Sequence, residues 1–335
     1  MNDTQHTRVT LARRPSGMAV RDDFALVSAP LPEPGPGEFR VRLAYVSLDP
    51  AMRGWMNDVK SYVPPLALGD TMRGFSAGYV ETSNNPDFAP GDPVAGLFGV
   101  QSHAISDGRG VAKCDLALAP LERWIGGLGM PGITAYFGTI DIAKPQPGET
   151  VVVSAASGAV GALVGQIAKM KGARTVGIAG GPEKCALVTG EYGFDEAIDY
   201  KADGWRDALV AATPNGIDVY FESVGGEIFD FVLTRMNTFG RIPVCGMISL
   251  YNATELPPGP KNIRSVLINR LTVRGFIVFD FITRYPEAMT ALAEWHAAGT
   301  LKMREDVRDG GLEAFADVLN LLYTGGNTGK LVLRL

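Results

Sequence analysis

The sequence predicts an α/β protein in which a doubly wound parallel sheet is inserted into a second, split β domain. A strand-like run, Val151–Val153, passes through small residues into a helical pattern. After about Arg123, strand and helix patterns alternate regularly, which is typical of parallel crossovers. Short strands bounded by Gly, Pro or Asp precede this region. With 335 residues the chain is long enough for about two domains.

The N-terminal part predicts a compact antiparallel barrel. Residues 24–27 form a strand pattern, residues 30–37 are rich in turn formers, and residues 39–46 alternate apolar and polar side chains. Further short strands are expected at 78–81 and 93–98. Such a series of short, evenly spaced strands favours a barrel.

The remainder predicts the parallel sheet and the return to the barrel. The expected order is helix 159–171, strand 174–178, helix 183–192, strand 196–200, helix 203–212, strand 217–222, helix 227–237 and strand 240–245. The tail adds a strand near Val307, a helix at 311–323 and a strand at 331–333. We therefore expect a β-barrel domain of residues 1–124 and 296–335, and a dinucleotide-binding domain of residues 125–295 with a substrate cleft between them.

A small-residue motif opens the first helix of the parallel sheet. Ala156, Gly158 and Gly161 have the spacing of G-x-G-x-x-G, with alanine in place of the first glycine. Glycines there let the backbone approach a pyrophosphate and let the helix pack on the strand, while the first helical amides face the phosphates. The alternative is a tight strand-to-helix turn that binds no ligand.

The end of the second parallel strand favours NADPH over NADH. An NAD site has a carboxylate about 20 residues beyond the glycines, but residues 178–181 contain none. Lys184 follows and offers a positive charge to a ribose phosphate. The alternative is that Lys184 is a solvated lysine on a helix face, beside Glu183 in the first turn.

Composition excludes several classes of function. The net charge of −5 and the scattered basic residues disfavour nucleic acid. No apolar run is long enough to span a membrane, and the first residues lack a secretory pattern, so we expect a cytoplasmic protein. The histidines, His6, His103 and His296, are dispersed and form no metal motif. The cysteines, Cys114, Cys185 and Cys245, are expected to be buried thiols.

Four separated runs resemble one family along essentially the whole chain. These are residues 155–161, 222–226, 245–252 and 326–330. Together they resemble the zinc-independent medium-chain dehydrogenases/reductases, and most closely the prostaglandin reductase and plant double-bond reductase (alkenal/one oxidoreductase) branch. The resemblance implies a doubly wound parallel (Rossmann) domain inserted in a split GroES-like β-barrel catalytic domain.

The resemblance implies no metal site. Zinc-dependent relatives are expected to carry a cysteine after the second barrel strand and a G-H-E motif some way beyond it. Here the matching stretches contain Ser47, Gly74 and Phe75. Because a catalytic zinc needs three protein ligands, metal-assisted alcohol oxidation is rejected.

The same resemblance implies a set of NADPH-binding residues. Lys184 and Tyr200 would contact the 2′-phosphate, and Gly158, Ala159, Val160 and Gly161 would hold the pyrophosphate. The rest of the path would be lined by Ser223, Cys245, Gly246, Met247, Ile248, Ser249, Tyr251, Phe276, Ile277, Val278 and Asn327. Ser223 departs from the asparagine that is usual in the family.

The expected reaction is reduction of the carbon–carbon double bond of an α,β-unsaturated aldehyde or ketone. Hydride added to the β-carbon moves charge to the carbonyl oxygen, so the site needs a donor for the enolate. Tyr251, helped by the nicotinamide ribose hydroxyl, is the expected donor; the alternative is that its ring only packs. Two rival functions are an NADPH quinone oxidoreductase and a non-enzymatic NADPH-binding protein.

The substrate pocket and the assembly are less defined by the sequence. Ala51 and Phe75 stand where the plant branch has substrate-facing tyrosines, so a more apolar pocket is expected. Its candidate walls are Trp55, Met56, Tyr62, Met130, Phe279 and Phe281. An exposed sheet edge in the dinucleotide-binding domain makes a homodimer the expected assembly.

Overall fold

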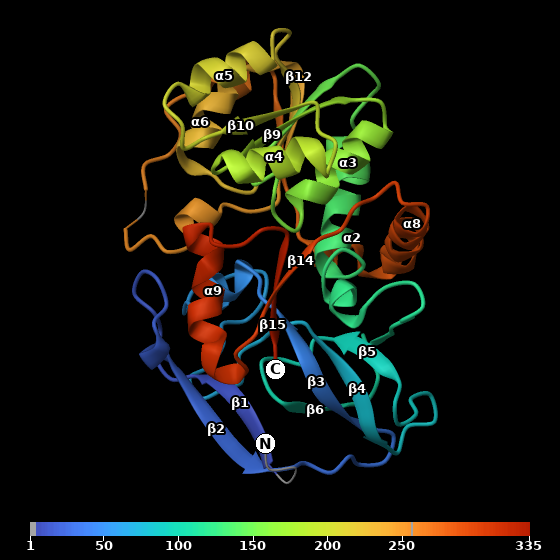
Figure 1. Cartoon of the computed structure of the whole chain (residues 1–335). Coiled ribbons are helices and arrows are strands. Elements are labelled where there is room, and N and C mark those ends of the chain that lie inside the picture. The colour runs from blue at the N-terminus through green and yellow to red at the C-terminus, as the bar shows by residue number, and fades with distance from the viewer. Residues whose placement is uncertain (1–4, 256) are drawn as a thin grey trace. The chain divides into compact units, whose positions relative to one another are not determined.

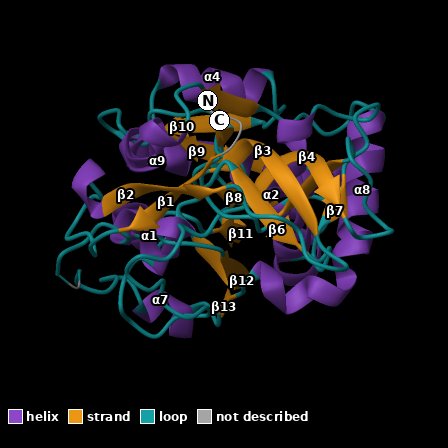
Figure 2. Cartoon of the chain, turned by 90° about the horizontal axis from the view of Figure 1, so that it is seen from below, coloured by secondary structure: helices purple, strands orange, loops and turns teal. Residues whose placement is uncertain are grey.

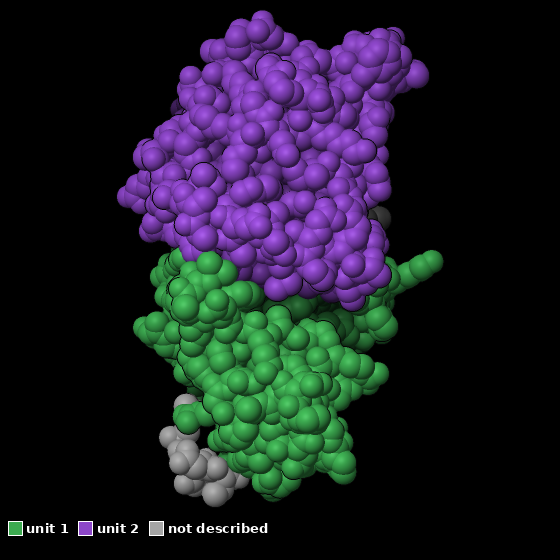
Figure 3. All heavy atoms as spheres, turned by 90° about the vertical axis from the view of Figure 1, so that its right-hand side faces the viewer, with its two compact units in different colours: residues 1–126, 305–335 green, residues 127–304 purple. Residues whose placement is uncertain are grey.

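A computed structural model describes residues 5–255 and 257–335. The chain forms two compact units, coloured separately in Figure 3. Unit 1 is the chain up to Gly126 together with Glu305–Leu335, and unit 2 is Gly127–Arg304. Residues 296–304, expected in the barrel, lie in unit 2. Helix α8 continues to Ala297, and Lys302 exchanges two hydrogen bonds with Gln166 of the same unit.

Unit 2 is built on a six-stranded parallel sheet, which confirms the predicted fold class. The strand order is β10-β9-β8-β11-β12-β13, and Figure 2 shows the strands in this order. The strands are β8 Thr150–Val153, β9 Arg174–Ala179, β10 Glu196–Asp199, β11 Ile217–Phe221, β12 Met236–Val244 and β13 Thr272–Gly275. The helices are α2 Met130–Phe137, α3 Gly161–Met170, α4 Pro182–Gly190, α5 Trp205–Ala212, α6 Gly226–Leu233, α7 Arg264–Ile268 and α8 Tyr285–Ala297. Three further segments of 3₁₀ or π helix are η3 Gly138–Ala143, η4 Ile248–Leu250 and η5 Val278–Arg284.

Alternation along the strands gives this sheet two apolar faces. On one face the core contains Val152, Val176, Ile178, Ile198 and Tyr220 with Trp205, Leu209, Ile228, Phe229 and Val232 of α5 and α6. Gly177 lies between Val176 and Ile178 and so faces the other way, where a Cβ would come within 2.7 Å of Val188 in α4. Helices therefore cover both faces, as the doubly wound fold requires (Figure 1).

Unit 1 contains a hairpin and a seven-stranded mixed sheet. The hairpin is β1 Gln5–Leu11 with β2 Phe24–Pro30. The sheet order is β14-β15-β3-β4-β5-β7, with β6 paired to β3. Its strands are β3 Phe39–Ser47, β4 Ser76–Ser83, β5 Pro93–Gly96, β6 His103–Ser106, β7 Ala112–Lys113, β14 Glu305–Arg308 and β15 Lys330–Arg334. The helices are α1 Ala51–Trp55 and α9 Phe315–Thr324, with short turns η1 Arg21–Asp23, η2 Leu121–Ile125 and η6 Leu312–Ala314.

Two expectations about strands and helices need correction. The sheet of unit 1 is not purely antiparallel, because β14 pairs in parallel with β15. The predicted helix 227–237 ends at Leu233, and the following strand begins at Met236. That strand carries a register shift against β11, and Phe239 adopts the left-handed φ of +63°. The irregularity hid the start of the strand from a period-two pattern.

Among the described residues, no helix is long and apolar enough to cross a membrane.

Candidate functional site

The carboxyl edge of the parallel sheet brings the predicted cofactor residues of unit 2 together. All loops that follow parallel strands leave at this edge. Read across the sheet from β10 to β13, the loops carry the predicted residues in the order Tyr200, Lys184, Gly158–Gly161, Ser223, Cys245–Tyr251 and Phe276–Val278. This is the order expected for one dinucleotide laid from its adenosine end to its nicotinamide end.

The small-residue motif forms a tight turn that only small residues can build. Ala155 adopts a φ of +49°, and its carbonyl accepts a hydrogen bond from the Gly158 amide at 2.9 Å. A Cβ on Gly161 would lie 2.4 Å from that carbonyl oxygen. Helix α3 begins at Gly161 rather than at 159. The Ala162 and Leu163 amides donate to the Gly158 and Val160 carbonyls, each at 3.1 Å, and the amides of residues 159–161 lie before them at the start of the helix. The turn and these amides fit a pyrophosphate.

A second glycine turn, after β9, lies under Tyr200. A Cβ on Gly180 would come within 2.9 Å of the Tyr200 ring and 3.1 Å of the Lys201 side chain. Lys184 lies in the first turn of α4, which begins at Pro182. The two loops thus place an aromatic ring and lysines beside the Gly180 backbone, which fits a phosphate on the adenosine ribose.

Sequence reasoning missed two charged residues at this end of the site. The Asp199 carboxylate accepts hydrogen bonds from the amides of Gly181 at 2.7 Å and Lys201 at 3.0 Å, so it holds the two loops together. Lys201 was missed as a second candidate cation beside Lys184. The signal was available in the run Asp199-Tyr200-Lys201, which begins with the last residue of β10 and continues into the loop after it.

The loops after β11 and β12 are joined by main-chain hydrogen bonds. The Ile248 amide donates to the Ser223 carbonyl at 3.1 Å, and the Ser249 amide donates to the Val224 carbonyl at 3.0 Å. The Ser249 hydroxyl also donates to the Val224 carbonyl, at 2.6 Å. Residues 223–225 and 245–251 therefore behave as one platform at the expected nicotinamide end.

Tyr251 is the last residue of this platform and directly follows η4. Its hydroxyl oxygen accepts a hydrogen bond from the Met247 amide at 3.3 Å, and a Cβ on Gly246 would come within 3.0 Å of the same oxygen. The ring is thus folded back over its own loop at the carboxyl end of β12. Next to it, the buried Asn252 Oδ1 has no hydrogen-bond partner within the described residues, which leaves an acceptor for a ligand.

The segment after β13, residues 276–278, offers mainly its backbone to the candidate cofactor site. The Phe276 ring is buried, 6.2 Å from the Phe221 ring in a T-shaped arrangement. Ile277 donates to the Asp280 carboxylate at 3.1 Å, and the Val278 carbonyl accepts from the Tyr285 hydroxyl at 3.2 Å. These contacts fix the segment, and the Phe276 side chain serves the core.

Asn327 belongs to unit 1, where its amide donates to the Gly329 carbonyl at 3.1 Å. Next to it the Thr328 amide donates to Asp306, and Arg308 pairs with the same carboxylate. These bonds hold the loop between α9 and β15.

The cysteines are poor nucleophiles. Burial raises the pKa of Cys114 to about 12 and that of Cys245 to about 12. The pKa of Cys185 is also raised, by burial and by the nearby Asp199 carboxylate. Thiolates, the reactive form, are therefore disfavoured at all three.

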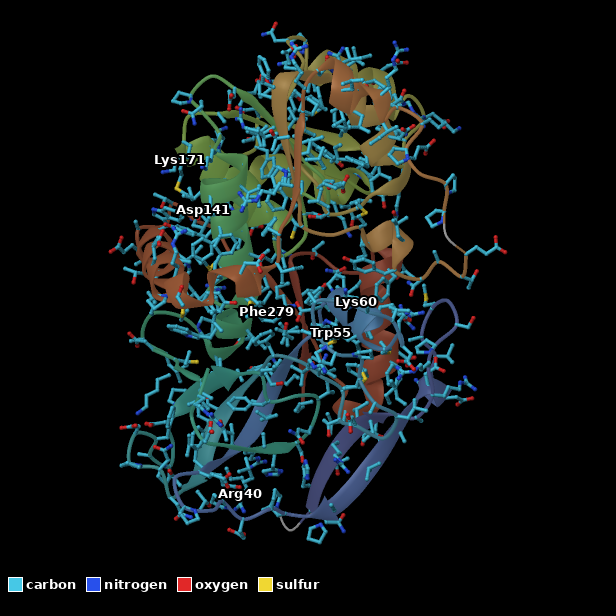
Figure 4. The ribbon with its side chains drawn as sticks, turned by 180° about the vertical axis from the view of Figure 1, so that it is seen from behind. Arg40, Trp55, Lys60, Asp141, Lys171 and Phe279 are labelled. Carbon is cyan, nitrogen blue, oxygen red and sulfur yellow. The ribbon has the colours of Figure 1, made fainter. Side chains whose placement is uncertain are left out.

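The candidate pocket walls separate into core and non-core residues. Met56 is fully buried in the core of unit 1, and Phe281 stacks on Phe137 with ring centroids 4.4 Å apart, so neither is a pocket wall. Trp55, labelled in Figure 4, donates to the hydroxyl of the half-exposed Tyr62 at 3.1 Å. Tyr62, Met130 and Phe279 stay candidates.

A lysine stands beside the position where zinc-dependent relatives are expected to keep a ligand. Ser47 donates to one oxygen of the Asp49 carboxylate at 2.5 Å, and the buried Lys330 ammonium donates to the other at 2.6 Å. Burial lowers the pKa of Lys330, and the Asp49 carboxylate acts in the opposite direction. Throughout residues 5–255 and 257–335, no three His, Cys, Asp or Glu side chains are grouped so as to hold a metal ion.

Comparison with known proteins identifies the relatives of this chain. A family model described as the N-terminal domain of oxidoreductase matches residues 7–114, and one described as zinc-binding dehydrogenase matches residues 159–294. The NADPH-dependent curcumin reductase of Escherichia coli is 45% identical over 335 residues, covering 98% of this chain and 97% of the relative. The NADP(+)-dependent 2-alkenal reductase of Nicotiana tabacum is 42% identical over 302 residues, covering 89% and 88%.

A solved structure shows the same relationship in three dimensions. The crystal structure of CurA from Vibrio vulnificus in complex with NADPH matches with a TM-score of 0.92 and 44% identity, covering 98% of both chains. The match spans both units, so it extends beyond the dinucleotide-binding sheet. The chain belongs to the zinc-independent medium-chain dehydrogenase/reductase family, in its prostaglandin reductase and double-bond reductase branch.

Proposed function

We propose that this protein reduces the carbon–carbon double bond of α,β-unsaturated aldehydes and ketones, with NADPH as the cofactor. The observation that carries the proposal is the Tyr251 phenol, which lies at the carboxyl end of β12 over the platform of residues 223–225 and 245–251. Relatives named for curcumin reduction and alkenal reduction support the substrate class.

NADPH, when bound, supplies the hydride. Gly158–Gly161 would hold its pyrophosphate, and Lys184, Tyr200 and Lys201 would surround the 2′-phosphate. Two turns that require glycine support this placement, because a Cβ at Gly161 would meet the Ala155 carbonyl and a Cβ at Gly180 would meet the Tyr200 ring. Residues 178–181 contain no carboxylate, and the nearby Asp199 carboxylate is bonded to the amides of Gly181 and Lys201.

Tyr251 is the proposed donor to the developing enolate. Hydride addition to the β-carbon leaves negative charge on the carbonyl oxygen, and a fixed donor at that oxygen lowers the barrier. The phenol oxygen accepts a hydrogen bond from the Met247 amide, which holds the hydroxyl at this position, and a phenol is a hydrogen-bond donor as well as an acceptor. The proton that completes the alkane comes from this tyrosine or from water.

A substrate panel tests the function. Purified protein would be given NADPH with a medium-chain enal, an enone or a quinone, and the NADPH absorbance and the product mass would be followed. We expect NADPH oxidation with the enal and the enone, and a product that gains two hydrogens and keeps its carbonyl. Oxidation with quinones alone would assign the protein to the quinone oxidoreductase alternative, and no oxidation with any of them to the non-enzymatic one.

We also propose a homodimer formed through the edge strand β13. β13 is exposed along its length at the end of the six-stranded sheet. Exposed apolar residues lie near it, with Leu267 78% and Phe239 65% exposed. A second copy that pairs with this edge would satisfy the free backbone and cover these side chains.

The free cysteines favour a reducing compartment, so we place the protein in the cytosol.

A further inference from the structure

Glu222 is a buried carboxyl at the end of β11 that binds the loop following it. Its side chain is fully buried. One oxygen, Oε1, accepts hydrogen bonds from the Val224 amide, from the Gly225 amide at 2.8 Å and from the Ser154 hydroxyl at 3.2 Å. Gly225 needs its φ of +78° for this turn. One atom therefore organises residues 223–225.

The same loop carries the segment that ends in Tyr251. The main-chain carbonyl of Glu222 accepts from the Cys245 amide at 2.8 Å. The carbonyls of Ser223 and Val224 accept from Ile248 and Ser249, as described above. Any change in the conformation of residues 223–225 is thus transmitted to residues 245–251.

The chemistry of Glu222 suggests that the acceptor atom, rather than its charge, is what the loop needs. Burial raises the pKa of the Glu222 carboxyl, while the hydrogen bonds from Gly225, Val224 and Ser154 act in the opposite direction. Burying a carboxyl costs more folding free energy than burying an apolar side chain of similar size, unless hydrogen bonds to the carboxyl compensate for the lost solvation. A glutamine side chain offers the same acceptor oxygen without a charge.

We propose that Glu222 is a positioning residue for the nicotinamide half of NADPH, because its carboxyl oxygen fixes residues 223–225 and, through them, residues 245–251. This inference rests on the proposed cofactor site. Glu222 acts without touching the cofactor, and the 2′-phosphate end does not depend on it.

The test compares two ligands and two variants. NADPH binding would be followed by its fluorescence, and binding of 2′,5′-ADP, which carries only the adenosine and 2′-phosphate end, by calorimetry. For Glu222→Met, which removes the acceptor, we expect NADPH to bind about tenfold more weakly and 2′,5′-ADP to bind within about twofold of wild type. For Glu222→Gln we expect both affinities within about threefold of wild type.

Controls separate the possible outcomes. Thr213→Val removes another buried hydroxyl of unit 2, which bonds the Leu209 carbonyl in α5, and should change neither affinity. Lys184→Ala should weaken both ligands; if it weakens neither, the proposed cofactor site is wrong, independently of Glu222. If Glu222→Met does not fold, Ser154→Ala replaces it and should weaken NADPH selectively, because Ser154 also accepts from the Ser223 amide at 2.8 Å.

Three results would overturn the inference. Equal weakening of both ligands by Glu222→Met or Ser154→Ala would mean a general role in folding. Unchanged NADPH affinity would mean that the platform does not depend on the carboxyl. Equal weakening by the Gln and Met variants would mean that the charge, and not the acceptor atom, is required.

Discussion

The phenol of Tyr251 accepts a hydrogen bond within its own loop, from the Met247 amide four residues earlier. A hydroxyl fixed in this way loses little freedom when a substrate carbonyl arrives, which is the condition for effective stabilisation of developing charge. A ring that only packed over the cofactor would need no such bond.

Replacing Tyr251 with phenylalanine tests this role. If the phenol donates mainly in the transition state, single-turnover NADPH oxidation with an enone should slow by about 10²-fold, or about 2.7 kcal/mol. NADPH affinity should change little, because the ring is retained. An unchanged rate constant would mean that the ring only packs.

The 2′-phosphate end makes a separate prediction at Lys184. Its charge should interact with the phosphate of NADPH and not with NADH. Lys184→Ala should therefore cost about 1.5–3 kcal/mol of NADPH binding, roughly one to two decades in affinity, and leave NADH binding nearly unchanged. Titrating the variant with both cofactors checks this, and an equal loss for the two would remove the phosphate argument.

Residues of the site were predictable where their signal is local in sequence. Gly158 and Gly161 follow from a motif whose spacing is itself the geometry. The Asp199 and Glu222 carboxylates accept hydrogen bonds from backbone amides of loops that come close only in the folded chain. No fixed spacing in the sequence therefore predicts these contacts. Met56 was misassigned because a buried methionine looks the same in sequence whether it lines a pocket or a core.

Among the elements, the position of α3 depends on a close contact between Gly165 and the Phe194 ring. A Cβ there would fall 1.8 Å from the Phe194 ring. The close approach brings the helix down onto β8 and β9, and it sets the direction in which the first amides of α3 point. Gly190, at the end of α4, has no atom within 4 Å of an added Cβ.

These two glycines form a matched pair for measuring that packing. Gly165→Ala should lower the free energy of unfolding by about 1–3 kcal/mol, because the ring or the helix must move. Gly190→Ala should be neutral or stabilising by up to about 1 kcal/mol. Denaturant unfolding of the two variants checks both values, and equal stability would mean that Phe194 moves freely.

The existence and order of the elements were largely predictable, and their ends were not. The alternation after Arg123 gives the parallel sheet, because each crossover needs a helix between strands. The start of β12 escaped prediction because the register shift around Phe239 breaks the periodicity on which strand prediction relies. The parallel pairing of β14 with β15 could not be predicted, because nothing in the sequence of these two segments indicates that they pair or in which register.

At the scale of the whole molecule, the β13 edge predicts the assembly. Light scattering after size exclusion should give two copies for the wild type. Leu267→Asp, which adds a charge at an exposed apolar site beside the edge, should give one. Ile282→Asp is the control, since Ile282 is 62% exposed in η5, and it should leave the dimer intact. A monomeric wild type would refute this assembly.

The strand order has a consequence for how such a protein can change. In the proposed site, residues 150–201, on β8 to β10, would provide the end for the 2′-phosphate, whereas residues 217–251, on β11 and β12, would provide the end with Tyr251. The two ends are therefore encoded by stretches of chain that do not overlap, and distant substitutions add nearly independently. Substitutions in residues 150–201 can thus change the preference between NADPH and NADH without disturbing the hydride-transfer end formed by residues 217–251.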